Sequence, residues 1–165
     1  MTESKNFTIR KTIFILVTLL CNTVRAQTIS VGGTDWAAPI TAISEAGNNY
    51  AGTSESAANQ ILIAGSISLL GSSTISARYV PNPNWNSALQ IALRRTGPGS
   101  PCVLCTISSN TNYHEITQTA TSLISISGLG GTYSNIPFQI RISGISVTIP
   151  AASYSATVIF TITAG

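Results

Sequence analysis

The C-terminal stretch of the chain alternates between apolar and polar side chains, and this alternation constrains the fold more than any other feature. From Tyr154 onward, every second residue is apolar, and the residues between are Ser or Thr with a single Ile. Successive side chains of a β-strand point to opposite faces, so this period of two predicts a long strand with one apolar face. Pro150 marks where the strand can begin, because proline cannot donate to a ladder. The apolar face comprises Tyr154, Ala156, Val158, Phe160 and Ile162.

The same period of two recurs along the chain, whereas helical spacing does not. One strand is expected after Pro137, where Phe138, Ile140 and Ile142 alternate with polar residues until Gly144. The segment Ala51–Gln60 lacks an apolar stripe and is expected to hold at most a helical turn. Other expected strands are Ile61–Leu69, Ile75–Tyr79 and Leu89–Leu93, with weaker ones near Ile29–Val31, Ile40–Ala42, Val103–Ile107, Ile116–Thr119 and Ile124–Ile126.

Composition supports an all-β fold in a single domain, residues 27–165. Of these 139 residues, 40 are Ile, Val or Thr, which fit a pleated sheet, and strong helix formers are scarce. Gly-, Pro- and Asn-rich turn signals separate the short strands. Many short strands at such spacing predict an antiparallel sandwich or barrel of about seven to ten strands.

Residues 1–26 have the pattern of a secretory signal peptide. A positive stretch precedes an apolar run of ten residues, and small side chains occupy positions −3 and −1 of a cut before Gln27. The run is half the roughly 20 residues that span a bilayer, so we expect a cleaved leader, no membrane span and a secreted protein. The positive residues are Lys5, Arg10 and Lys11, the run is Thr12–Cys21, and the small residues are Val24 and Ala26.

The formal charge of +3 belongs to this leader. From Gln27 to Gly165, four arginines balance four acidic residues, and lysine is absent. Binding to nucleic acid needs clustered cations, so no nucleic-acid partner is expected. The eight charged residues are Arg78, Arg94, Arg95, Arg141, Asp35, Glu45, Glu55 and Glu115.

Cys102 and Cys105 are the only cysteines after the leader, and an even pair in an oxidising compartment suggests a disulfide. In an extended strand their Cα atoms would be roughly 10 Å apart, beyond the ~7 Å limit for a disulfide. A bond therefore requires a turn, which the preceding Pro/Gly-rich residues 98–101 favour. Free thiols, or a redox or metal role, remain the alternatives.

Catalytic chemistry finds little support in the sequence. His114 is the only histidine and Asp35 the only aspartate, and there is no G-x-S-x-G motif to supply a nucleophilic serine. A zinc site would have to combine Cys102 and Cys105 with His114 and Glu115, short of four spaced Cys/His ligands. We therefore expect no enzyme activity, no catalytic or metal site and no cofactor.

Trp85 is the clearest candidate for a ligand contact. It lies in Pro-Asn-Pro-Asn-Trp-Asn, a polar loop with one large flat side chain on which a sugar ring could stack. The alternative is that Trp85 folds back to cover one end of the sandwich.

Pro150–Thr163 resembles the closing strand of secreted fimbrial subunits of the chaperone–usher type and of related bacterial surface β-sandwiches, which end in Gly or Ser, then Tyr, then alternating apolar residues. The resemblance implies an immunoglobulin-like (Ig-like) sandwich that is completed by the N-terminal strand of a neighbour. The matching donor is Thr28–Val31, with Ile29 and Val31 as its apolar residues, and a longer donor would extend through Trp36, Ala38, Ile40 and Ala42. The neighbouring cysteines depart from the family, in which many pilins bridge distant ones.

Two functions follow as expectations. The first is a structural or adhesive protein of the bacterial surface, periplasm or extracellular space, a fimbrial or filament-like subunit that joins copies of itself or other subunits by β-strand addition. A neutral surface without lysine lacks the usual protection against such addition. The second is a secreted carbohydrate-binding module with a glycan as its partner.

Overall fold

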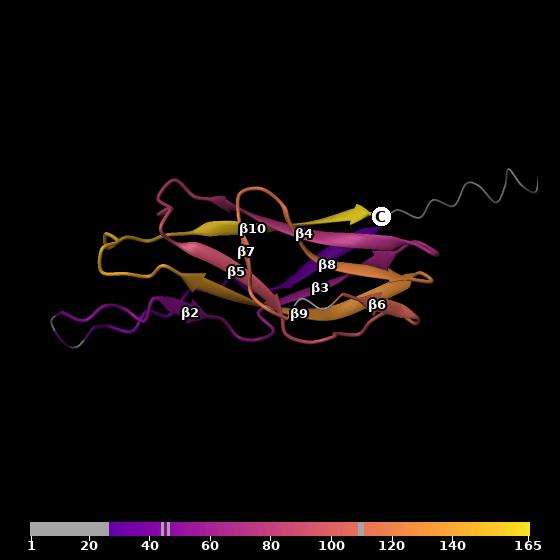
Figure 1. The fold of residues 1–165 in the computed structure, drawn as a ribbon, viewed down its shortest axis with the longest axis horizontal. Coiled ribbons are helices and arrows are strands. Elements are labelled where there is room, and N and C mark those ends of the chain that lie inside the picture. Colours follow the sequence, from indigo (N-terminus) through magenta and orange to yellow (C-terminus); the bar gives the residue numbers. More distant parts are fainter. Residues whose placement is uncertain (1–26, 44, 46, 109–110) are drawn as a thin grey trace, which may run out of the picture.

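In the described part of the chain, ten antiparallel strands form two sheets that pack face to face (Figure 1). The computed structural model describes residues 27–43, 45, 47–108 and 111–165, so the expected signal peptide lies outside the described residues. The expected all-β antiparallel sandwich is confirmed, and the described residues contain no helix. The strands are β1 (Thr28–Gly33), β2 (Thr53–Glu55), β3 (Ile61–Ile67), β4 (Ser72–Pro81), β5 (Gln90–Arg95), β6 (Cys105–Ile107), β7 (His114–Ile116), β8 (Thr121–Gly128), β9 (Gly131–Ser143) and β10 (Ala156–Ala164).

The chain alternates between the two sheets for most of its length. The six-stranded sheet has the order β1-β3-β9-β5-β7, with β2 paired to β9, and the four-stranded sheet has the order β10-β4-β8-β6. From β3 to β10, each strand therefore lies in the sheet opposite to its predecessor. The connections therefore cross between the two layers instead of joining neighbours within one sheet.

Branched aliphatic side chains fill the space between the sheets. The inward face of each central strand contributes residues with less than 2% of their surface exposed, and Phe138 of β9 meets Phe160 of β10 edge-on, with ring centroids 6.3 Å apart. The alternation in the sequence thus predicted correctly which side chains face the core. The enclosed residues include Tyr133, Phe138, Ile63, Ile75, Leu93, Ile116, Ile124, Ile126 and Ile136.

Several expected boundaries were wrong. β9 starts at Gly131 and runs through Pro137, which pairs with Leu62 of β3 and accepts a hydrogen bond from the Thr96 amide. The ladder with β5 ends at Phe138, so the missing N–H of the proline interrupts no ladder hydrogen bond. Residues 53–55, expected near a helical turn, form β2, and Ile40–Ala42 form no strand. Tyr154 precedes β10, and its hydroxyl donates to the Pro150 carbonyl instead.

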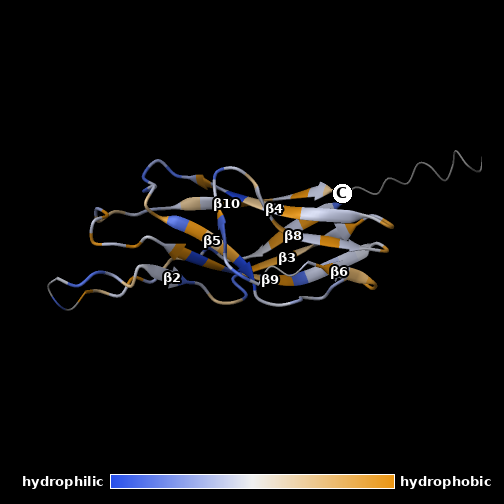
Figure 2. Ribbon diagram, viewed as in Figure 1, coloured by the Kyte–Doolittle hydropathy of each residue, from blue (hydrophilic) through white to orange (hydrophobic). Residues whose placement is uncertain are grey.

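The two ends of the sandwich differ in character (Figures 1 and 2). The turns β3–β4 and β8–β9 and the loop before β6 lie together at the right-hand end, where Figure 2 shows apolar colouring at their tips. The C-terminus lies at this end too, and the Gly165 amide donates to the Ser72 carbonyl. The long segments that connect β1 to β2 and β9 to β10 lie at the left-hand end.

Candidate functional site

The outward edge of β10 is the longest exposed strand edge among the described residues. β10 pairs with β4 in an unbroken register of nine residue pairs, from Ala156↔Pro81 to Ala164↔Ser73, and no described strand pairs with its other side. The edge carries no charge, proline or bulge, the features that normally prevent strand addition. The predicted apolar face is correct from Ala156 onward, since Ala156, Val158, Phe160 and Ile162 pack on the core.

The N-terminal segment predicted as a donor pairs within its own chain. Ile29 lies opposite Gly65 and Val31 opposite Ile63, so β1 forms an edge of the six-stranded sheet. Ile29 packs against the core, whereas Val31 is 50% exposed. The structure therefore places Ile29 and Val31 in the opposite sheet, where β1 contacts β10 across the gap between the sheets but does not pair with it.

An apolar cleft opens between the two sheets near the start of β10. Its volume is about 1170 Å³, and it is bounded by the end of β1 with the segment that follows, by the inner faces of β9 and β10, and by the β9–β10 loop. This apolar cleft is larger than the ~300–1,000 Å³ typical of small-molecule sites. Its walls include Val31, Trp36, Ala38, Tyr50, Trp85, Ile140, Ile142, Val147, Tyr154, Val158 and Phe160.

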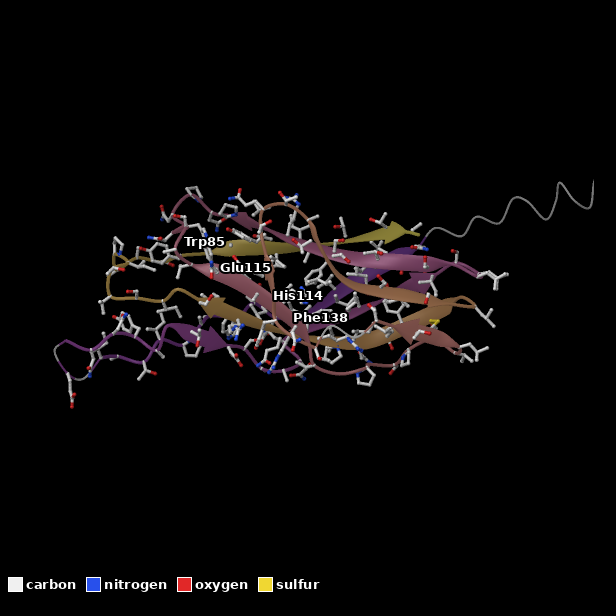
Figure 3. The ribbon with its side chains drawn as sticks, viewed as in Figure 1. Trp85, His114, Glu115 and Phe138 are labelled. Carbon is white, nitrogen blue, oxygen red and sulfur yellow. A yellow bond between two sulfur atoms is a disulfide. The ribbon has the colours of Figure 1, made fainter. Side chains whose placement is uncertain are left out.

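Trp85 both covers the end of the sandwich and borders this cleft (Figure 3). Its ring packs against the core and against Tyr79, with centroids 5.7 Å apart. Its indole N–H is enclosed and has no hydrogen-bond partner among the described residues. Trp85 is therefore held mainly as a packing residue, with only part of its surface available to a ligand.

The cysteines form the turn that a disulfide requires. Their Cα atoms are 5.2 Å apart, and the Cys105 amide donates to the Cys102 carbonyl over 3.0 Å. The predicted disulfide is thus confirmed in geometry, and the alternative of free or metal-binding thiols loses its support. The turn presents Val103 and Leu104, exposed by 82% and 71%, to solvent.

Two neighbouring turns add further exposed leucines beside the disulfide turn. Leu69 and Leu70 are exposed by 81% and 76%, and Leu129 by 47%. The turns are adjacent, because the Gly128 amide donates to the Gly71 carbonyl and Gly130 packs on the Leu69 backbone. We call Leu69, Leu70, Val103, Leu104 and Leu129 the apolar tip. The sequence signal was a leucine or valine inside an otherwise Ser- and Gly-rich turn.

A cluster of arginines and a tyrosine lies on the outer face of the six-stranded sheet. The guanidinium carbons of Arg141 and Arg94 lie 3.7 Å and 4.6 Å from the centroid of the Tyr113 ring, and Arg141 forms an ion pair with Glu55 at 3.8 Å. Burial and the nearby Glu55 carboxylate raise the pKa of Tyr113, while the two arginines act in the opposite direction. Arg94 also donates twice to Gln139. This network secures the segment before β7 to the sheet.

The acidic residues and His114 do not converge. Glu55 on β2 and Glu115 on β7 are three strand spacings apart, roughly 14 Å at about 4.8 Å each, which is too far for paired-carboxylate chemistry. His114 and Glu115 lie on β7, away from the disulfide (Figure 3). Within the described ranges, no three His, Cys, Asp or Glu side chains gather where a metal could bind.

In the part of the chain that the structure describes, no helix is long and apolar enough to cross a membrane. Comparison with protein-family models, with curated proteins and with solved structures finds no match to this chain.

Proposed function

We propose that this protein is a secreted structural or adhesive surface subunit that associates with other copies by strand addition at the free edge of β10. The observation that carries the proposal is an edge nine residues long with which no described strand pairs, and which has no charge, proline or bulge. Such an edge is a template for pairing with another strand, because its outward N–H and C=O groups need partners. The signal-peptide pattern and the disulfide favour an exported protein.

The strand added to this edge is β10 of a second copy. β1 stays in its own sheet, where it pairs with β3 over six residues, so the chain does not need a neighbour to complete that layer. Two β10 strands that pair antiparallel would join two four-stranded sheets across a two-fold axis. The outer face beside β10 carries mostly small polar side chains, namely Ser72, Thr74 and Ser76 of β4 and the threonines of β10, with Arg78 opposite Ile159 as its charged position.

Thr161→Lys tests the proposal, because a lysine on an edge strand opposes pairing. The matched control is Ser76→Lys, which adds the same charge directly opposite Thr161 in register but on a strand already paired on both sides. We expect wild type and Ser76→Lys to associate in sedimentation and electron microscopy, and Thr161→Lys to stay monomeric with an unchanged circular dichroism spectrum. Equal association of Thr161→Lys and Ser76→Lys would refute strand addition at β10.

A second candidate function, carbohydrate binding, draws support from the walls of the apolar cleft. Trp36, Tyr50, Trp85 and Tyr154 border it together with the polar side chain of Asn82. Aromatic rings and a nearby amide suit stacking on a sugar ring and hydrogen bonding to its hydroxyls. A glycan array tests this candidate, with Trp36→Ala expected to lose the signal and Trp85→Ala to weaken it. An array without signal would remove the candidate.

A further inference from the structure

We infer that the apolar tip of one copy docks into the apolar cleft of the next, so that copies extend head to tail. The inference rests on the proposed function in that it names a second copy as the partner, but it uses a different surface from the β10 edge. The tip and the cleft lie at opposite ends of the long axis of the sandwich (Figure 1). A contact between two different patches on identical chains is heterologous, and it generates an open chain of subunits unless the rotation between successive copies closes a ring.

At two positions of the tip, leucine occupies a strained backbone conformation. Leu70 and Leu104 have φ of +54° and +58°, a left-handed conformation in which a side chain such as leucine is strained and for which glycine or asparagine is suited. Asn135 is the only other described non-glycine residue with positive φ. Both strained leucines are more than 70% exposed, so packing within the chain does not explain them. Strain of this kind points to a contact that the leucines make elsewhere.

The tip and the cleft match in shape and in polarity. The tip is a set of three protruding turns without a charged residue, covering residues 68–71, 102–105 and 128–131. The cleft is a concavity with mainly apolar walls, and Asp35 is its single charged lining residue. Its volume accommodates several aliphatic side chains together. A lipid surface fits the tip less well, because the tip has neither the aromatic nor the cationic residues typical of interfacial anchors.

The area involved sets the strength of the contact. Burying one aliphatic side chain removes on the order of 60–120 Å² from water, so the five partly exposed residues of the tip and their counterpart in the cleft bury roughly 400–900 Å² together. Stable complexes bury at least about 1,200 Å². A single tip–cleft contact is therefore weak. Once β10 pairing has joined the copies, several such contacts form together, and the overall affinity rises.

The decisive variant replaces both strained leucines, as Leu70→Asn together with Leu104→Asn. Asparagine tolerates the left-handed conformation, so the melting temperature should not fall, which excludes misfolding as the cause of any loss. Val80→Asn serves as the control, because Val80 is an exposed apolar residue outside both the tip and the cleft.

The experiment is a nuclear magnetic resonance titration with every chain carrying Thr161→Lys, which removes edge pairing. Isotope-labelled protein is observed while the unlabelled Leu70→Asn/Leu104→Asn variant, whose cleft is intact, is added. We expect resonances at the tip of the labelled protein to shift, because its tip can enter the cleft of the variant. At the cleft of the labelled protein, binding should be weaker by at least about tenfold than with the Val80→Asn partner. Equal cleft shifts with both partners, or no shifts up to about millimolar concentration, would overturn the inference.

The outcomes separate this inference from the proposed function. If wild-type protein associates and Thr161→Lys does not, while the titration shows no tip-dependent shift, then edge pairing stands and head-to-tail docking fails. If Thr161→Lys associates as wild type does and the titration shows the one-sided pattern, docking stands and edge pairing fails. Flotation of the protein with phosphatidylcholine vesicles that depends on the two leucines, without self-association, would assign the tip to lipid and overturn docking.

Discussion

Tyr133 illustrates how single residues tune this sandwich. Its side chain is 1% exposed, and its hydroxyl has no hydrogen-bond partner among the described residues. Gly65 makes room for the ring, since a Cβ at that position would lie 2.5 Å from the tyrosine oxygen and would collide with the Thr28 carbonyl. Burial raises the pKa of Tyr133, because the phenolate is harder to desolvate than the phenol.

Tyr133→Phe is expected to increase the free energy of unfolding by about 1 kcal/mol at pH 7, because it removes a buried hydroxyl without a partner. The raised pKa means that the folded state holds its proton more tightly than the unfolded state, whose tyrosine titrates near 10. The contribution of Tyr133 to stability is therefore complete below pH 10 and is lost as the pH rises above it. Urea unfolding from pH 8 upward should show a smaller alkaline loss in the variant. A steeper loss would contradict this assignment.

For single residues, the sequence predicted which side chains face inward better than it predicted which neighbours surround them. Its alternation placed Phe138, Phe160 and Ile162 on inward faces, but it gave no sign that Arg95 would be only 8% exposed, with its guanidinium donating to the Gly97 carbonyl. It also left Trp85 between two roles, because whether a loop aromatic turns inward depends on neighbours from distant strands, here Tyr79.

Among the elements, the disulfide turn is the smallest with a defined role. It closes a loop of only four residues, at a sequence separation of 3, and it projects Val103 and Leu104 into solvent. The cross-link reduces the freedom of the unfolded chain and also fixes two of the five residues of the apolar tip.

Replacing both cysteines, as Cys102→Ala with Cys105→Ala, is expected to lower the free energy of unfolding by about 2 kcal/mol, the chain-entropy value for so short a loop. Chemical denaturation at neutral pH measures the change. Reduced wild-type protein is the control and should fall by a similar amount. Unchanged stability in both would mean that the turn is held without the bond.

Strands were predictable where apolar residues alternate over several positions, as in β4, β8, β9 and β10. β2 was not predicted, because Thr-Ser-Glu has no apolar residue. This strand forms by pairing with the end of β9. Ile40–Ala42 has suitable residues, but it follows Pro39, whose carbonyl accepts a hydrogen bond from Ser54 in an irregular segment. Such outcomes depend on partners far away in sequence.

For the whole molecule, association between copies is expected to follow from its low charge and from the apolar tip and apolar cleft at its opposite ends. Residues 27–165 carry four positive and four negative charges, and Arg141 pairs with Glu55 on the outer face of the six-stranded sheet. Repulsion between copies is therefore small, and contacts form through main-chain hydrogen bonds and apolar side chains. The order of strands was beyond sequence reasoning, because alternation identifies faces and not neighbours.

Assembly is accordingly expected to depend little on ionic strength. Between about 20 mM and about 500 mM salt, the protein concentration at half-assembly should change by less than about twofold, because screening acts on charges that the contacts do not use. Light scattering across this range provides the measurement, with Thr161→Lys as the non-assembling control. A fall in assembly by an order of magnitude at high salt would show instead that charge pairs hold the copies together.

The most direct test of the central claim is amide hydrogen exchange along β10 in dissociated and assembled protein. In the dissociated protein, amides of Ala156–Ala164 that bond to β4 should be protected, and those on the outward edge should exchange rapidly. In the assembled protein, strand addition predicts protection of both sets, with β1 unchanged. Rapid exchange of the outward amides in assembled protein would contradict strand addition at β10.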